Sequence, residues 1–333
     1  MAEGKSVSRR WLYIAWIGAA LIVAAYFALW RHAAGEMETA ASAWVDEQRA
    51  SGLFVAHDGF RRDGFPFVLR LHVDNPQIAT PDGWRWSAPR LSMDALPYDF
   101  NRVIFSSRGA QTIRAPDGET WSLSAGDLRA SLANDKEREW ILSAQIENAR
   151  VTNVAAAPIE LGSLLFDIAP SADEPDAFTL SLAARDLATK TEYGAIDGDS
   201  LNAAFTLTSA SALGAFDPLP SWRSAGGRLR IHGIEALVNE AGVTVVGDLG
   251  LSADLFPEGD ARVSLSKPAG IAPLLAATGA LSADEANAAA AGLGFAALAQ
   301  GGVLVAPIVF EEDAIKIAGV RLSIDARPAV EAE

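Results

Sequence analysis

Histidines and one serine–lysine pair come nearest to metal-binding or catalytic chemistry. The histidines are His32, His57, His72 and His232. Each is too far from the others for two of them to bind zinc from one helical turn, so we interpret them as surface residues. Ser264 and Lys267 have the spacing of the pair that acyl-transfer enzymes carry at the start of a helix. Here the pair ends a predicted strand before Pro268, which disfavours a nucleophile and its base.

Two acidic stretches carry oxygen atoms that calcium binds. Asp197-Gly198-Asp199 and Glu311-Glu312-Asp313 lack the ligand spacing of a calcium loop, so we expect both to form turns. Neither a Gly-x-Ser-x-Gly elbow nor a phosphate-binding Gly-Lys-Ser/Thr loop occurs in the sequence. We therefore expect no catalytic residues, no metal, no cofactor and no enzymatic activity.

The remaining chemistry is the binding of an apolar ligand. Trp84 and Trp86 are two residues apart and share one face of a regular strand. Such a pair packs into an ordinary core or lines a groove, and the sequence favours the core. If the apolar sheet face is open, the ligand-groove candidates are Phe67, Leu69, Leu71, Trp84, Trp86, Val243, Val245, Leu249 and Leu251.

An uncharged stretch from Trp11 to Trp30 positions everything that follows. As a helix it is roughly 30 Å long, which matches the hydrocarbon thickness of a bilayer. The aromatic residues Trp11, Trp16, Tyr26 and Trp30 suit the two headgroup regions, and the basic residues before the stretch place the N-terminus in the cytoplasm. A cleaved signal peptide is the alternative, but its apolar core is normally shorter.

A second helical pattern covers residues 36–50, and Gly52 suits the position just after its end. No strong helix breaker separates this stalk (31–52) from the anchor (11–30), so the membrane helix can continue outward. We favour a stalk that packs on the rest of the chain over a helix that binds a partner.

From Leu53 the hydrophobic period changes to two. Seven alternate positions from Val243 to Leu255 are apolar or glycine, which is typical of antiparallel sheets with one apolar face. Turns are expected at Pro81-Asp82-Gly83, Pro116-Asp117-Gly118, Asp197-Gly198-Asp199 and Pro257-Glu258-Gly259-Asp260. Residues 79–87 and 114–122 resemble each other, which indicates a repeated hairpin or chance similarity of turn residues.

Two late helices interrupt the strands, at about 271–278 and 282–299. Ser282 and Glu285 form a capping box at the start of the second. Its small residues suit close packing on a sheet: Ala286, Ala289, Ala290, Leu293 and Ala297. A final hairpin (303–310 and 314–318) and a last strand (320–324) follow.

The charge excludes polyanion partners. The sequence has a net charge of −15, and residues 32–333 alone carry −18. This charge repels nucleic acid and anionic membrane surfaces. Cysteine is absent, so the chain has neither disulfides nor thiolate metal sites.

Several short motifs resemble a known family. They are Gly64-Phe65-Pro66, residues 79–86, Ser87-Ala88-Pro89, Leu96-Pro97-Tyr98, Gly226-Gly227-Arg228-Leu229 and Gly247-Asp248-Leu249-Gly250. Over residues 35–325 the chain is similar to bacterial domain-of-unknown-function family 2125. The resemblance implies an inner-membrane-anchored periplasmic protein of alphaproteobacteria and brings no catalytic residues. The layout is more loosely similar to AsmA-type envelope proteins.

These observations predict a mainly β protein: a cytoplasmic tail (1–10), the anchor, the stalk, a large mostly antiparallel curled sheet or groove with two late helices (53–327), and a tail (328–333). We expect it in the inner membrane with its bulk in the periplasm. A binding module for a lipid or other hydrophobic envelope component is one functional hypothesis. A structural or interaction protein of the cell envelope, with a protein partner and no ligand, is the alternative.

Overall fold

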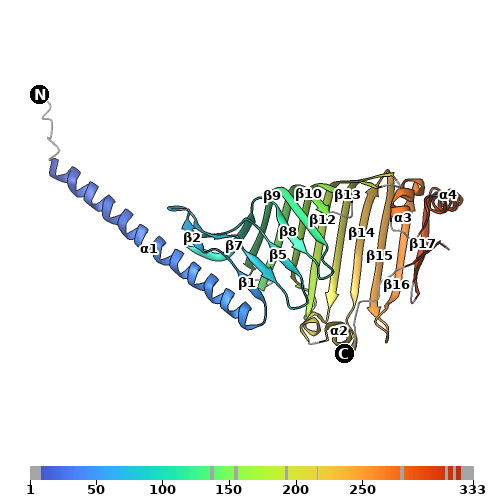
Figure 1. The fold of residues 1–333 in the computed structure, drawn as a ribbon, viewed down its shortest axis with the longest axis horizontal. Helices are drawn as coiled ribbons and strands as arrows, with labels where there is room; N and C mark the ends of the chain where they lie inside the picture. The colour runs from blue at the N-terminus through green and yellow to red at the C-terminus, as the bar shows by residue number, and fades with distance from the viewer. Residues whose placement is uncertain are drawn as a thin grey trace, which may run out of the picture.

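The computed structural model describes residues 9–135, 139–153, 157–191, 194–215, 217–277, 281–311, 314–317 and 320–323. Within these residues a single long helix, α1 (Arg9–Ala50), leads into one sheet of 19 strands whose pairings are all antiparallel. Figure 1 shows α1 at one end of the sheet, the strands side by side along its length, and two late helices at the other end. The predicted fold class, mainly β with an N-terminal helix and two late helices, is confirmed.

The strands fall into three groups along the chain. The short strands nearest α1 are β1 (Phe54–Ala56), β2 (Phe60–Asp63), β3 (Leu69–Asp74), β4 (Gln77–Ala79), β5 (Arg85–Ser87), β6 (Arg90–Leu96), β7 (Asp99–Ser107) and β8 (Gln111–Arg114). The long strands are β9 (Thr120–Asp135), β10 (Glu139–Asn153), β11 (Ile159–Pro170), β12 (Ala177–Thr191), β13 (Gly194–Thr208), β14 (Leu229–Val238), β15 (Ala241–Leu251) and β16 (Pro257–Ser266). The last are β17 (Val303–Glu311), β18 (Ala314–Ile317) and β19 (Val320–Ser323).

Strand β9 is the branch point of the sheet. Its first residues pair with β8 and its later residues with β7, so two arms of short strands meet along one long edge. One arm is β1-β4-β5-β8 and the other is β2-β3-β6-β7. From β9 to β19 each strand pairs with the next in sequence. The sheet is therefore one extended layer (Figure 1). It is uncurled, whereas we expected a curled sheet or groove.

Helix α1 includes both the predicted anchor and the predicted stalk without a break. It ends as the sequence predicts: Gly52 adopts a positive φ of 97°, and the amide of Leu53 donates to the carbonyl oxygen of Gln48 at 3.0 Å. This is a Schellman ending, in which the left-handed residue is normally glycine. Trp30 and Ala34 of α1 pack against Leu69 of β3, so the stalk packs on the sheet.

The predicted turns are correct in part. Pro81-Asp82-Gly83 joins β4 to β5 and Pro116-Asp117-Gly118 joins β8 to β9, and these two similar hairpins pair through β5 and β8. The other two predictions were wrong. Asp197-Gly198-Asp199 lies inside β13, and the pairing of β13 with β14 shifts register between Gly198 and Ser200. Pro257 begins β16, and the turn before it is closed by the amide of Ser252 donating to the carbonyl oxygen of Phe256.

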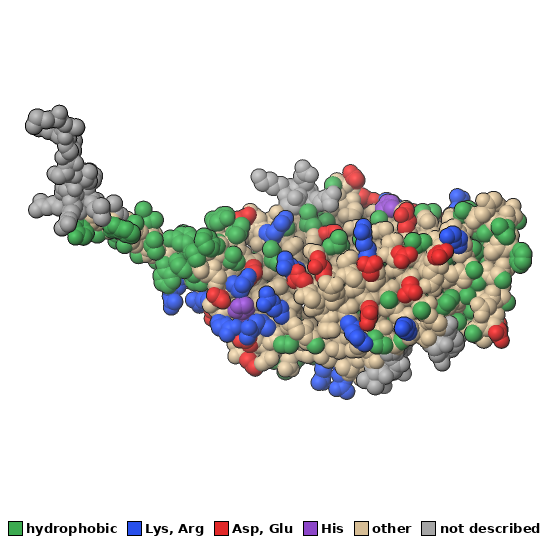
Figure 2. Space-filling view, turned by 90° about the horizontal axis from the view of Figure 1, so that it is seen from above, with side chains coloured by type: hydrophobic (Ala, Val, Ile, Leu, Met, Phe, Trp, Pro, Cys, Tyr) green, Lys and Arg blue, Asp and Glu red, His purple; other side chains and the backbone are tan. Residues whose placement is uncertain are grey.

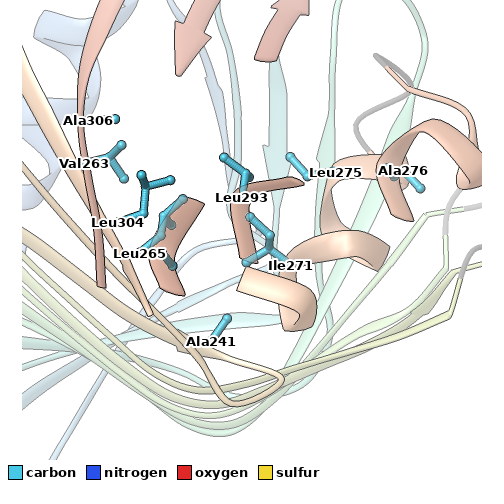
Figure 3. Close-up of a cluster of buried hydrophobic side chains, with 11 residues drawn as sticks. Ala241, Val263, Leu265, Ile271, Leu275, Ala276, Leu293, Leu304 and Ala306 are labelled. Atoms are coloured by element: carbon cyan, nitrogen blue, oxygen red, sulfur yellow. The ribbon is translucent and has the colours of Figure 1, made fainter. Parts of the chain in front are cut away.

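The largest buried cluster lies at the end of the sheet remote from α1. A 3-10 turn, η2 (Pro268–Ile271), and the helices α3 (Ala272–Ala277) and α4 (Ala283–Ala299) pack there on β15, β16 and β17. Figure 3 shows Leu293 of α4 among Leu265, Leu304 and Ile271. The predicted small-residue face of α4 is the buried one, because alanines let a helix lie close to a sheet.

The capping box of α4 is present, and its Ser282 side chain accepts a hydrogen bond from the amide of Glu285. Another 3-10 turn, η1 (Ala210–Gly214), and helix α2 (Pro218–Ser224) were not predicted. They follow β13, and the indole N–H of Trp222 donates to the carbonyl oxygen of Thr208 at 2.7 Å. The predicted tail 328–333, the last residue of the final strand, Ile324, and residues 1–8 lie outside the described residues.

Candidate hydrophobic ligand face

Strand register brings apolar side chains onto one face from β3 to β17. Directly paired residues of an antiparallel sheet share a face, so the pairings can be followed from strand to strand. One such row is Leu71, Met93, Phe105, Ala130, Ala144, Phe166, Leu182, Ala203, Ile234, Val245, Val263 and Ala306. Every member is apolar. At about 4.8 Å between strands, the row is roughly 50 Å long.

A second row on the same face is also apolar throughout. It comprises Leu69, Ala95, Val103, Leu132, Leu142, Ile168, Leu180, Phe205, Ile231, Gly247, Ala261, Ile308 and Ile317. The row between them projects from the opposite face and is mostly polar, with Arg70, Asp94, Ile104, Ser131, Ser143, Asp167 and Ser181. The sheet therefore has one apolar face and one polar face along most of its length.

Helices cover this apolar face at its two ends. Helix α1 packs on Leu69 at one end, and α3 and α4 pack on the large cluster at the other. Among the described residues, neither buried cluster includes a side chain from β9 to β14. The large apolar side chains there, such as Leu142, Phe166 and Leu180, are only half-buried. We call the apolar face of β9–β14 the central apolar face; it is the candidate site.

The predicted groove residues divide between the two ends rather than lining the central apolar face. Leu69 and Leu71 are fully buried, with 0% and 1% exposure, in the part of the sheet next to α1. Val243 and Val245 pack against the cluster beneath α3 and α4. Leu249 and Leu251 continue the same face of β15 and are half-buried. Phe67 lies in the loop before β3 and is 78% exposed.

The tryptophan pair is split. Trp86 lies in β5, on the same face as Ile78 and Ile113, and its indole N–H donates to Oε1 of Gln111 at 2.9 Å. Trp84 precedes the strand and is exposed. None of the predicted groove residues lies on the central apolar face. The signal that points to this face in the sequence is the alternation Phe178-Thr179-Leu180-Ser181-Leu182. Only strand register shows that such short patterns join into one surface.

A polar pocket of about 580 Å³ lies on the opposite face, near α1. Its lining includes Arg61, Arg70, Arg90, Arg108 and His72. Figure 2 shows basic side chains gathered around a histidine near the end of the sheet from which α1 projects. Burial lowers the pKa of His72 below its ordinary value, and the positive charges of Arg61, Arg90 and Arg70 lower it further. Its Nδ1 lies 2.8 Å from the hydroxyl of Ser92.

The other polar candidates have ordinary structural contacts. Ser264 lies within β16, and Nζ of Lys267 forms an exposed ion pair with Glu240 at 3.3 Å. Nδ1 of His57 accepts a hydrogen bond from the amide of Gly59, and Nε2 of His232 lies 2.8 Å from the hydroxyl of Thr206. Among the residues that the structure describes, no three histidines or acids gather as metal ligands.

These features define the chain as a one-sheet antiparallel β protein with an N-terminal helix long and apolar enough to cross a membrane, a test that signal sequences also pass. The chain belongs to the bacterial family described as "Uncharacterized protein conserved in bacteria (DUF2125)", which matches residues 30–324. The resemblance of the short motifs is thereby confirmed. No curated protein and no solved structure matches the chain.

Proposed function

We propose that this protein is anchored in the inner membrane by α1 and holds the acyl chains of a lipid, or a similarly hydrophobic envelope component, against the central apolar face. The observation that carries the proposal is the pair of unbroken apolar rows, whose members in β9–β14 remain half-buried or, at Leu132, exposed. Apolar area left in contact with water is unfavourable, and large surface patches of this kind mark binding sites.

The chemistry of the face selects the kind of ligand. Phe166, Leu180 and Leu182 offer only hydrocarbon, so contact with them discriminates by apolar area rather than by hydrogen bonding. Each methylene group that moves from water onto such a surface contributes about 0.8 kcal/mol. A long, narrow row favours a linear hydrocarbon chain over a compact molecule. No step of bond making or breaking is part of this function, and we propose a binding protein rather than an enzyme.

Photocrosslinking in cells tests the proposal. A photoreactive phenylalanine analogue replaces Phe166 on the central apolar face, or Leu165 next to it, whose side chain projects from the polar face and is exposed. Mass spectrometry of the purified full-length protein then identifies adducts. We expect lipid adducts at position 166 and at least tenfold fewer at position 165. Equal labelling at both positions, or none at 166, would refute the proposal.

The location is tested separately. Reporter domains that are active only in the cytoplasm or only in the periplasm are fused after residue 333. We expect activity from the periplasmic reporter and membrane retention of the fusion. A cytoplasmic reporter that is active would refute the proposed topology.

A protein partner is the second candidate function, favoured by α4. Phe295 and Leu298 of this helix are 75% and 74% exposed and line an apolar hollow of about 460 Å³. An envelope protein with a complementary apolar side chain would cover them. The same photoreactive residue at position 295 distinguishes this function, because it would give protein adducts and position 166 would give none.

A further inference from the structure

Two loops beside α1 carry large aromatic side chains into solvent. The loop between β2 and β3 contains Phe67, which is 78% exposed. The β6–β7 hairpin contains Tyr98 and Phe100, which are 80% and 54% exposed. The loops are neighbours, because Leu69, which follows the first loop, pairs with Ala95, which precedes the second. We call residues 64–68 and 96–100 together the aromatic rim.

The aromatic rim contacts α1 at one defined height, that is, at one position along the helix axis. The ring of Phe65 lies against those of Tyr26, Phe27 and Trp30, with centroids 6.1, 5.2 and 5.6 Å away. The hydroxyl of Tyr26 donates to the carbonyl oxygen of Pro66, and the indole N–H of Trp30 donates to that of Val68. Within the rim, Gly64 has a φ of 97°, and an added Cβ would lie 2.5 Å from the carbonyl oxygen of Val68, so this tight turn requires glycine.

This height coincides with the outer end of the proposed membrane span. If residues 11–30 cross the bilayer, Tyr26 and Trp30 lie at its outer headgroup level. They are only about 6 Å apart along the helix axis, so the contacts with both fix the rim at that level. Aromatic side chains are favoured in this region because one part of the ring is apolar and the other tolerates water. The exposed rings of the rim thus have an apolar environment directly beside them.

We infer that the aromatic rim inserts into the outer headgroup region of the membrane that holds α1, so that the sheet meets the bilayer at its surface. The inference rests on the proposed membrane anchor. It also gives the central apolar face a route to its ligand. The row begins at Leu69 and Ala95, which are buried beside the rim, and its next members, Val103, Leu132 and Leu142, are half-buried or exposed and all apolar. Acyl chains that leave the bilayer beside the rim can reach the central face over this accessible part of the row.

Because the sequence has no cysteine, single cysteines give unique labelling sites in the full chain. An environment-sensitive fluorophore is attached at Phe67→Cys or Tyr98→Cys in protein reconstituted into phospholipid nanodiscs. Val23→Cys in the anchor is the positive control. The negative control is Phe295→Cys, an equally exposed aromatic position in α4, which lies at the far end of the sheet (Figure 1).

We expect blue-shifted emission at positions 23, 67 and 98 and water-like emission at 295. Lipids with a quencher near the headgroup should quench labels 67 and 98 more strongly than lipids with a deep quencher, and label 23 should show the reverse. Water-like emission at positions 67 and 98, together with blue-shifted emission at position 23, would refute the insertion of the aromatic rim and would still support the membrane anchor. Water-like emission at 23 overturns the anchor and the rim together. The labels require no bound ligand, so the result is independent of the crosslinking at Phe166.

Discussion

The indole N–H of Trp30 donates a hydrogen bond to the carbonyl oxygen of Val68 at 3.0 Å, and this contact joins the proposed anchor to the sheet. The ring is 7% exposed and packs with Ala34 on Leu69. A flexible tether would leave the sheet free to move relative to the membrane. Trp30 instead ties β3 and the aromatic rim to one side of α1, so the orientation of the sheet follows from the packing of one helix.

Replacing Trp30 should loosen this end of the sheet. Trp30→Ala removes a buried ring and should destabilise the docked helix by about 3–5 kcal/mol, and Trp30→Phe, which loses mainly the hydrogen bond, by about 1 kcal/mol. Hydrogen exchange of peptides from residues 64–74 measures the effect. Trp44→Ala, an exposed tryptophan of the same helix, is the control and should leave exchange unchanged. Equal exchange in all variants would show that α1 does not hold β3.

Substitutions in α4 should destabilise the far end of the sheet only when they fall on the buried face of the helix. Leu293 is 6% exposed among Leu304 and Leu265, so Leu293→Ala should cost about 2–5 kcal/mol of unfolding free energy. Phe295→Ala, two residues away and exposed, should change stability by no more than about 0.5 kcal/mol. Thermal unfolding followed by circular dichroism measures both. A larger loss from Phe295→Ala would mean that its ring is covered.

The cap of α4 gives a smaller effect. The Ser282 side chain accepts from the amide of Glu285, and the carboxylate of Glu285 accepts from the Ser282 amide at 2.9 Å. Ser282→Ala should therefore cost about 1 kcal/mol, whereas Ser282→Asp should retain most of the stability because aspartate also caps helices. Chemical denaturation of the two variants side by side checks the expectation. Identical curves for wild type and Ser282→Ala would contradict it.

The sequence predicted those features that depend on neighbouring residues. Gly52, Ser282 and the alanines of α4 act within a few residues of themselves, so the end of α1 and the start and buried face of α4 were correct. Asp197-Gly198-Asp199 was mistaken for a turn because an irregular strand position carries the same residue types as a turn. The extent of the central apolar face could not be predicted, because only the register of separate strands places Phe166 opposite Leu182.

Acid should weaken the sheet through the protonation of His72. Burial and the charges of Arg61, Arg90 and Arg70 lower its pKa in the folded state, although Asp63 opposes the shift. A group whose folded pKa is depressed binds protons preferentially when the chain is unfolded. The contribution of His72 to the free energy of unfolding is therefore full above its ordinary pKa of 6.5 and is lost as the pH falls through its folded pKa. Melting temperatures of wild type should therefore fall as the pH drops below 6.5, and those of His72→Gln should fall less. Parallel curves would contradict the expectation; His232→Gln is the control.

A charge on the central apolar face should expel the ligand without unfolding the sheet. Phe166 is half-buried between Ala144 and Leu182, so a carboxylate at this position can still reach water. Phe166→Asp should nevertheless prevent at least two methylene groups of an acyl chain from contacting the face, and at about 0.8 kcal/mol each this lowers lipid occupancy about tenfold. Lipid adducts to a photoreactive residue at Leu180 on the same face report the occupancy. Leu165→Asp, one residue away on the polar face, should leave the adducts unchanged, and a similar loss in both variants would assign the effect to general destabilisation.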